Sequence, residues 1–166
     1  MTDRKDNPPS SPACAMHEAD DAYMGFAPAD ELIAALDELL EAERAGARVT
    51  LETARQAGDG PLGALMQAIQ HDEARWCAML SGHLKALGAT PSSRVGAFYD
   101  KAMAIAELDA RTRFLNRGQG WVVRKLAALL PRVRDDRLHA DLAAMLRAHE
   151  ANIARADTLV ARPPTT

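Results

Sequence analysis

The sequence is poor in the residues that build β-sheets and cysteine-based sites. Aromatic residues make up only 4% of the 166 residues, and Val, Ile and Thr are scarce beside Ala and Leu. Sheets favour aromatic and β-branched residues, whereas Ala and Leu favour helices. The chain has two cysteines, Cys14 and Cys77, and their positions form no zinc or redox motif and do not favour a disulfide. The composition therefore predicts a single all-α domain.

Long apolar runs are also missing. No apolar run approaches the length that crosses a bilayer. The first twelve residues, MTDRKDNPPSSP, lack the apolar core of a signal peptide. We therefore expect a cytoplasmic protein without membrane association.

A strong charge of one sign is absent as well. The net charge is −3, and residues 1–28 carry all of it, so the remaining chain is neutral. A neutral body argues against general binding of nucleic acid. The segment 111–137 holds eight basic residues and two acids. We expect this segment to be a solvated face that pairs with the acidic first helix; a nucleic-acid patch is the alternative.

The chain divides into three parts. Residues 1–28 form an acidic tail that contains Asn-Pro-Pro-Ser-Ser-Pro and is expected to be partly disordered. Residues 29–160 carry the periodic apolar pattern, and residues 161–166 are a short C-terminal tail. Three residues near the end of the acidic tail could pack against the helical part of the chain as an N-terminal strap: Tyr23, Met24 and Phe26.

Apolar residues recur every three to four positions in four segments, which predicts four amphipathic helices. The predicted helices are 28–57, 62–87, 97–130 and 137–160. Four such helices make a four-helix bundle the economical fold. The linker 89–96 and its flanks span at most about 33 Å. The sequence therefore leaves open whether the second and third helices are antiparallel or run parallel through a compressed crossover.

One polar residue interrupts the apolar stripe of each predicted helix. These residues are Glu43, Glu73, Gln119 and His149. At 1.5 Å per residue, the two glutamates lie within about 3 Å of the same height above the turn that joins their helices. Gln119 and His149 likewise share a height in the second hairpin. We therefore expect one polar layer inside the bundle.

The polar layer has two interpretations. Two carboxylates and an imidazole are the ligand types of iron or manganese sites in helical bundles. Alternatively, a protonated His149 lies between Glu43 and Glu73, and Gln119 completes a closed polar network.

Three further residues lie near the level of this layer. Asn116 faces the site from the third helix, and Arg113 could turn inward and neutralise Glu73, which would argue against a metal. Trp76 is expected to fill core space beside the glutamate. The residues alone do not decide whether the protein is an enzyme.

The pattern of inward-facing polar residues on the four predicted helices resembles that of the ferritin-like (rubrerythrin-type) four-helix superfamily. Glu43 matches the first-helix glutamate, and Asp72-Glu73 lies where the second helix of the superfamily carries Glu-x-x-His. His149-Glu150 falls where the second such motif lies. The runs LNRGQGWVVRKL (115–126) and HEANI (149–153) are similar to an uncharacterised bacterial family of ferritin-like domains. The resemblance spans residues 30–160 and implies this fold.

The chain departs from the superfamily pattern at the metal site. Trp76 replaces the histidine three residues after Glu73, and Leu146 stands where an acid precedes His149. A complete di-metal site takes about six ligands. Here the chain offers Glu43, Glu73 and His149, with Glu150 as a candidate fourth ligand, so the resemblance implies a degenerate site. Two functions follow: a protein that binds iron or manganese for redox or metal handling, or a non-catalytic module that binds a partner.

We also expect a homodimer through helix faces, because four apolar residues of the third predicted helix exceed a single apolar stripe. They are Leu126, Ala127, Leu129 and Leu130.

Overall fold

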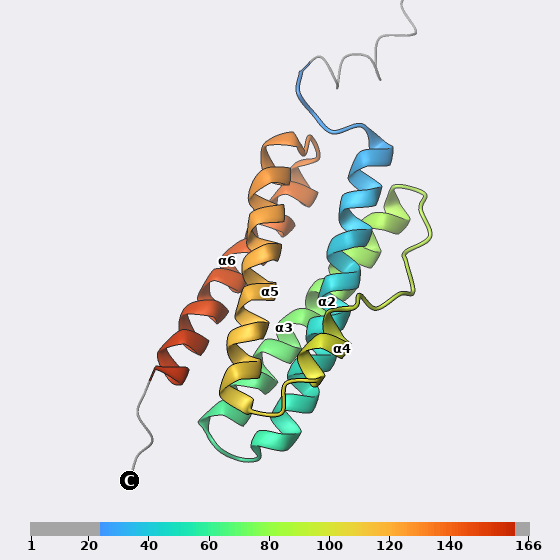
Figure 1. The fold of residues 1–166 in the computed structure, drawn as a ribbon. Coiled ribbons are helices and arrows are strands. Elements are labelled where there is room, and N and C mark those ends of the chain that lie inside the picture. Colours follow the sequence, from blue (N-terminus) through green and yellow to red (C-terminus); the bar gives the residue numbers. More distant parts are fainter. Residues whose placement is uncertain (1–23, 162–166) are drawn as a thin grey trace, which may run out of the picture.

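The computed structural model describes residues 24–161. This part of the chain contains α2 (Ala29–Ala57), α3 (Pro61–Ala86), α4 (Phe98–Met103), α5 (Leu108–Leu129), the 3-10 helix η1 (Leu130–Arg132) and α6 (Asp136–Val160). Four long helices lie side by side, and the short α4 packs outside α2 and α5 (Figure 1). None of the helices in residues 24–161 combines the length and the apolar character that a membrane span requires. The predicted all-α four-helix bundle is confirmed.

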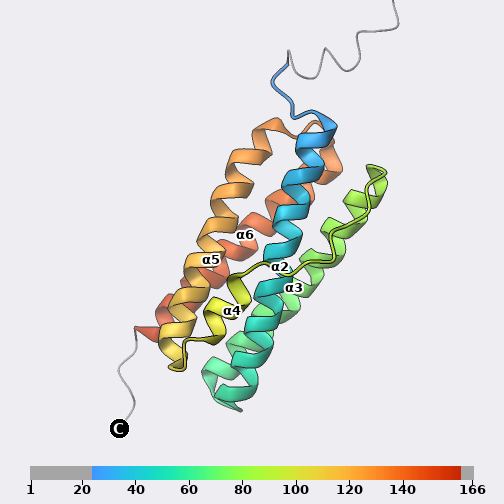
Figure 2. The ribbon, with the colours of Figure 1, turned by 45° about the vertical axis from the view of Figure 1, so that its right-hand side comes forward.

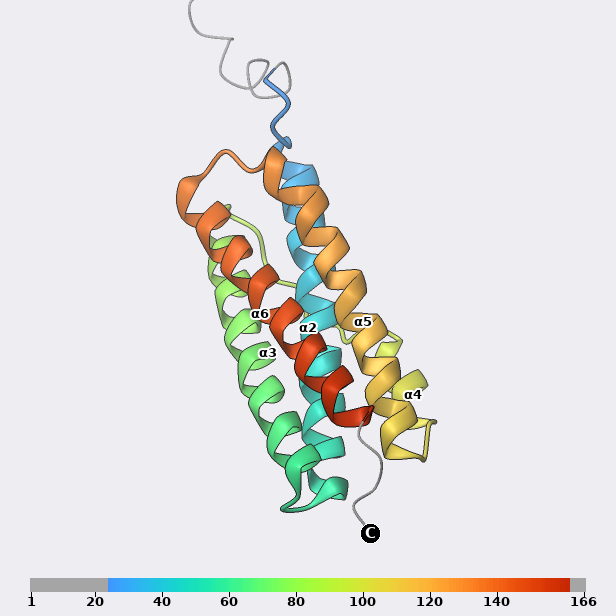
Figure 3. The same cartoon turned by 90° about the vertical axis from the view of Figure 1, so that its left-hand side faces the viewer.

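The bundle consists of two helical hairpins joined by a crossover. α2 pairs with α3, and α5 pairs with α6. The chain leaves the end of α3, runs back along the bundle in extended form and enters α4, so α3 and α5 run parallel (Figure 2). α2 then lies beside α5, and α3 beside α6 (Figure 3). Of the two connections that the sequence left open, the compressed crossover is the correct one.

Polar contacts fix the crossover on the outside of α2. The Ser92 backbone N–H donates to Asp37 Oδ1 at 2.8 Å, and Ser92 Oγ donates to Glu41 Oε1 at 2.6 Å. Arg94 Nε donates to the same Glu41 oxygen at 2.9 Å. The hydrogen bond from Ser92, supported by Arg94, holds the pKa of Glu41 below its usual value. The linker is therefore anchored to residues about fifty positions earlier in the chain.

The predicted third helix, 97–130, is broken in two, and this part of the prediction is wrong. α4 ends at Met103 and α5 begins at Leu108. Glu107 caps α5 because its carboxylate accepts the backbone N–H groups of Asp109 and Ala110. The buried Ala102, before the break, and Leu115, after it, belong to one core cluster. The apolar spacing therefore continues across the break, so the sequence pattern did not reveal the break.

A close approach between α4 and α5 explains a glycine inside a helix. A Cβ atom at Gly118 would lie 2.6 Å from Cζ of Phe98. The Phe98 ring therefore rests directly on the α5 backbone, and it stacks on Phe114 with 4.9 Å between ring centroids. This contact places α4 at one wall of the cavity described below.

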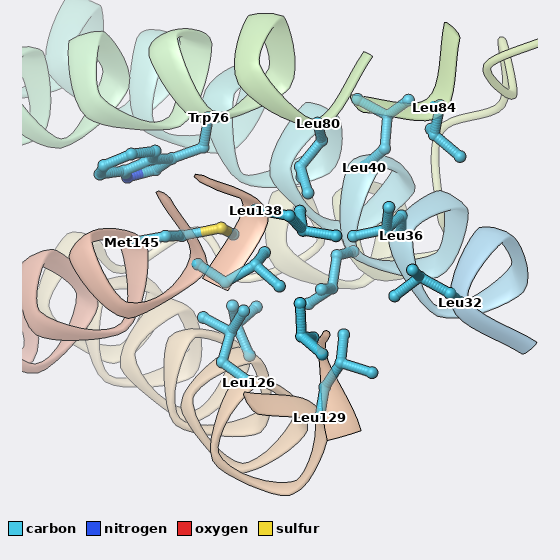
Figure 4. Packing of buried hydrophobic residues seen from close by; sticks show 14 residues of the cluster. Leu32, Leu36, Leu40, Trp76, Leu80, Leu84, Leu126, Leu129, Leu138 and Met145 are labelled. Atoms are coloured by element: carbon cyan, nitrogen blue, oxygen red, sulfur yellow. The ribbon is translucent and has the colours of Figure 1, made fainter. Parts of the chain in front are cut away.

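The core consists of two apolar clusters with the polar layer between them. Figure 4 shows the larger cluster, which includes Leu36, Leu40, Trp76, Leu80, Leu126 and Met145. The smaller cluster includes Val49, Met66, Ile69, Leu115 and Ala156. Along each long helix, the residue that interrupts the apolar stripe lies between members of these two clusters.

Only part of the predicted N-terminal strap can be placed. Met24 is 65% exposed, whereas Phe26 is half-buried. The Ala27 backbone N–H donates to the Arg132 carbonyl oxygen at 2.8 Å and ties this end to η1. The predictions for Tyr23, for the rest of the acidic tail and for residues 162–166 lie outside the described residues.

Ion pairs join the basic segment to the first helix, as predicted. Lys125 Nζ lies 2.7 Å from Glu38 Oε2. Arg132 binds Glu31 with two nitrogens, and this hydrogen bond lowers the pKa of the Glu31 carboxyl. Both pairs are exposed and contribute little stability. They show that part of the basic charge is paired within the bundle.

Candidate functional site

The four polar residues that interrupt the apolar stripes line one cavity. The cavity has a volume of about 300 Å³ and lies between α2, α5 and the start of α4. Glu43, Glu73, Gln119 and His149 all line it, and each of these side chains is at most 3% exposed. The lining also includes the exposed Glu38, so the cavity extends from the surface into the polar layer. The single buried layer predicted from helix spacing is therefore present; ligation of a metal by it remains a prediction.

Glu43 on α2 and His149 on α6 form a buried pair. His149 Nε2 lies 3.1 Å from Glu43 Oε1, and His149 Nδ1 lies 3.0 Å from the Met145 carbonyl oxygen. A carbonyl oxygen only accepts hydrogen bonds, so Nδ1 carries a proton and Nε2 is directed at the carboxylate. Burial by itself lowers the pKa of His149, but the hydrogen bond and the charge of Glu43 outweigh burial and raise it. The contact with Glu43 therefore favours the protonated form of the His149 imidazole.

The Glu73 carboxylate on α3 fits against a glycine of α2. A Cβ atom at Gly46 would lie 1.7 Å from Glu73 Oε2, so the carboxylate occupies the space of a side chain at position 46. Burial, followed by the negative charges of Glu43 and Asp72, raises the pKa of Glu73 well above its usual value. Gly46 is a site residue that the sequence analysis missed. Its signal was a glycine three positions after Glu43, on the same face of the helix.

Four buried polar atoms at the cavity have no hydrogen-bond partner within residues 24–161. They are Glu43 Oε2, Glu73 Oε2, Gln119 Oε1 and Gln119 Nε2. A buried polar atom without a partner costs about 1–3 kcal/mol, and such atoms are rare in native proteins. Their concentration on one cavity wall indicates a place for a ligand rather than a packing fault.

Two residues assigned to the site from the sequence lie elsewhere. The Glu150 side chain is exposed, which removes it from the candidate ligand set. One residue turns an α-helix by about 100°, so the neighbour of the inward-facing His149 faces solvent. Arg113 is exposed too, and the prediction that it turns inward is wrong. The buried arginine is Arg111, whose Nε donates to the Ile105 carbonyl oxygen at 2.8 Å, near the start of α5.

The other predicted neighbours are buried but do not line the cavity. Asn116 Nδ2 donates to the Ile153 carbonyl oxygen at 3.2 Å and to Asp157 Oδ1 at 2.8 Å, so it ties α5 to α6. Trp76 is 5% exposed and packs in the larger apolar cluster, as expected.

Cys77 is half-buried, and burial together with the charges of Glu43 and Glu73 raises its pKa to about 12. Its thiol therefore stays protonated, which is unfavourable for metal binding.

Comparison with solved structures defines the class of fold. The chain is similar to a crystal structure of ferritin like, diiron-carboxylate proteins from Bacillus anthracis str. Ames, with a TM-score of 0.70. The match covers 80% of this chain and 96% of that chain, at 16% sequence identity. At this identity the likeness shows the fold, which is that of a ferritin-like helical bundle.

A family model then places the chain more narrowly. The model of the family described as Domain of unknown function (DUF6306) matches residues 30–158, and the chain belongs to this family. A comparison with curated proteins gives no match.

The side chains at the cavity do not supply the ligands of a di-metal centre. A di-metal centre of the ferritin-like type takes two Glu-x-x-His motifs, and here Trp76 and Leu146 occupy two of those ligand positions. Within residues 24–161, no three His, Cys, Asp or Glu side chains are already grouped closely enough to hold a metal. A metal ion would therefore have to draw Glu73 toward the pair formed by Glu43 and His149.

Proposed function

We propose that this ferritin-like protein binds one iron or manganese ion through Glu43, Glu73 and His149, and serves in redox chemistry or metal handling. One observation carries the proposal: three helices bring two carboxylates and one imidazole to one cavity wall, and each carboxylate has a buried oxygen without a hydrogen-bond partner. Oxygen and imidazole ligands suit both metals, and the bound ion would supply reactivity toward oxygen or peroxide.

The remaining residues of the site would prepare these ligands. The Met145 carbonyl oxygen fixes the ring orientation of His149 through Nδ1, as backbone carbonyls do for metal-binding histidines. Gly46 leaves the space in which the Glu73 carboxylate can lie. Ligands must give up their protons to bind a metal, so binding would release protons from Glu73 and His149.

The direct test is the metal content of the full chain purified without chelators from cells supplied with iron or manganese. We expect a substantial fraction of an equivalent of one metal, and Glu73→Gln should remove most of it because an amide is a poor ligand for these ions. Glu150→Gln is the matched control, since its side chain is exposed, and should keep the wild-type content. The proposal is refuted if the wild type, whose site should be nearly saturated with metal, contains less than about a tenth of an equivalent of metal.

The second candidate function is a metal-free bundle whose polar layer specifies packing and whose outer faces bind a partner or a second copy. It is favoured by the contact between His149 and Glu43, which pairs the imidazole with one carboxylate oxygen without an ion. Under this alternative, Glu43→Gln changes stability while the metal content is zero in both proteins.

The homodimer stays a prediction, with a weaker basis than the sequence suggested. Leu126 and Leu129 were part of the apolar excess assigned to an interface, but both are buried within one chain. Ala127, also in this set, is exposed and small. Light scattering of the full chain would test for a dimer.

Binding of nucleic acid is still not expected. Lys125 and Arg132 form ion pairs with acids of α2, which removes part of the charge of the basic segment. Salt-dependent retention on DNA would contradict this expectation.

A further inference from the structure

The cavity is larger than one metal ion requires. Its volume of about 300 Å³ lies at the lower end of the range for small-molecule pockets. At about 30 Å³ per water-sized group, it has room for on the order of ten non-hydrogen atoms. An ion held by three side chains would fill only part of this space, so an organic molecule could lie beside it.

The walls of the cavity suit a flat apolar molecule. Phe98 of α4, Trp121 and Leu115 of α5, and Ala42 of α2 line it, apart from the polar residues. The Phe98 ring is held in place by its stacking on Phe114. Aromatic rings pack favourably against other rings in offset or edge-to-face contacts, which adds to the burial of apolar surface. An aromatic ligand would therefore match these walls.

Gln119 provides a specific polar anchor on the same cavity. Its amide is 3% exposed, and neither Oε1 nor Nε2 has a hydrogen-bond partner in the described part of the chain. A carboxamide can satisfy both atoms together, because its N–H donates to Oε1 while its carbonyl accepts from Nε2. A carboxylate offers no proton to Oε1, so it can pair only with Nε2 and leaves Oε1 without a partner. The unpaired amide therefore favours an uncharged amide ligand over an acid.

We infer that the cavity binds a small aromatic carboxamide of about ten non-hydrogen atoms, with its amide on Gln119 and its ring against Phe98 and Trp121. The inference goes beyond metal binding and does not depend on it, since Gln119 is not one of the proposed metal ligands. Binding should occur in the metal-free chain, so the two proposals can fail separately.

The test uses benzamide and the full chain freed of metal with a chelator. Isothermal titration should give saturable binding with one site and a dissociation constant of about 0.1–1 mM, as ligand efficiencies allow for a molecule of this size. Gln119→Leu keeps the volume of the side chain and removes the amide. It should weaken benzamide binding at least about tenfold, because two hydrogen bonds are lost.

Matched controls separate loss of the anchor from loss of the cavity. Gln67→Leu changes an exposed glutamine of α3 and should bind benzamide like the wild type. Toluene has the ring without the amide, and Gln119→Leu should bind it at least as well as the wild type does, which shows that the cavity persists. The inference is overturned if benzamide shows no saturable binding, if Gln119→Leu binds it with unchanged affinity, or if benzoate binds as tightly as benzamide.

Discussion

The fit between Gly46 and Glu73 gives a quantitative prediction for Gly46→Ala. The new Cβ atom would lie 1.7 Å from Glu73 Oε2, 2.6 Å from Cδ and 2.8 Å from Oε1. The Glu73 carboxylate must therefore leave its place. Overpacking of this kind costs about 1–3 kcal/mol. In the opposite direction, alanine is preferred to glycine within a helix by up to about 1 kcal/mol.

Gly82→Ala separates these two effects. Gly82 is an exposed glycine within α3, and a Cβ atom there meets no atom within 4 Å among the described residues. Gly82→Ala should therefore raise the free energy of unfolding by up to about 1 kcal/mol. The free energy of unfolding of Gly46→Ala should be about 1–3 kcal/mol lower than that of Gly82→Ala, because only at position 46 does the methyl group displace a buried side chain.

The assay is urea denaturation of the chelated protein, followed by circular dichroism at constant pH. A double-mutant cycle then tests the contact itself. In a Glu73→Ala background the obstructing carboxylate is gone, so Gly46→Ala should become neutral or stabilising, with a coupling energy of about 1–3 kcal/mol. If Gly46→Ala stabilises the wild type as much as Gly82→Ala does, the close packing of Glu73 on α2 is refuted.

The remaining predictions concern pH and the crossover. The folded-state pKa values of Glu73 and His149 are raised above 4.5 and 6.5. In the metal-free protein, each group therefore contributes its full stabilisation at a pH below its ordinary pKa of 4.5 or 6.5. This stabilisation is lost as the pH rises through the folded-state pKa. Urea titrations from about pH 5 to 8 should show this decline, and Glu73→Gln should reduce it; an unchanged slope would contradict the assignment. Ser92→Ala should destabilise the protein by about 0.5–1.5 kcal/mol and speed amide exchange in residues 89–97. The exposed Ser93→Ala should do neither.

The sequence by itself determined the helices and the polar layer. An α-helix converts residue spacing into a face and a height, at 3.6 residues per turn and 1.5 Å per residue. For this reason, four polar residues at matching distances from their turns could be placed together before any coordinates were known. The cavity wall that contains Glu43, Glu73, Gln119 and His149 confirms that reasoning. The spacing predicted a four-helix bundle, and the resemblance to a known family identified this bundle as ferritin-like.

The tertiary structure alone decided the remaining features, because each depends on contacts between distant segments. The crossover is fixed by contacts of Ser92 with α2, and no local signal in the linker specifies them. The break before Leu108 was hidden because the apolar period continues through it. The space that Gly46 leaves for Glu73 arises only when α2 and α3 pack together. Spacing along one helix predicts which residues face inward, whereas the partners that they meet depend on how the helices pack.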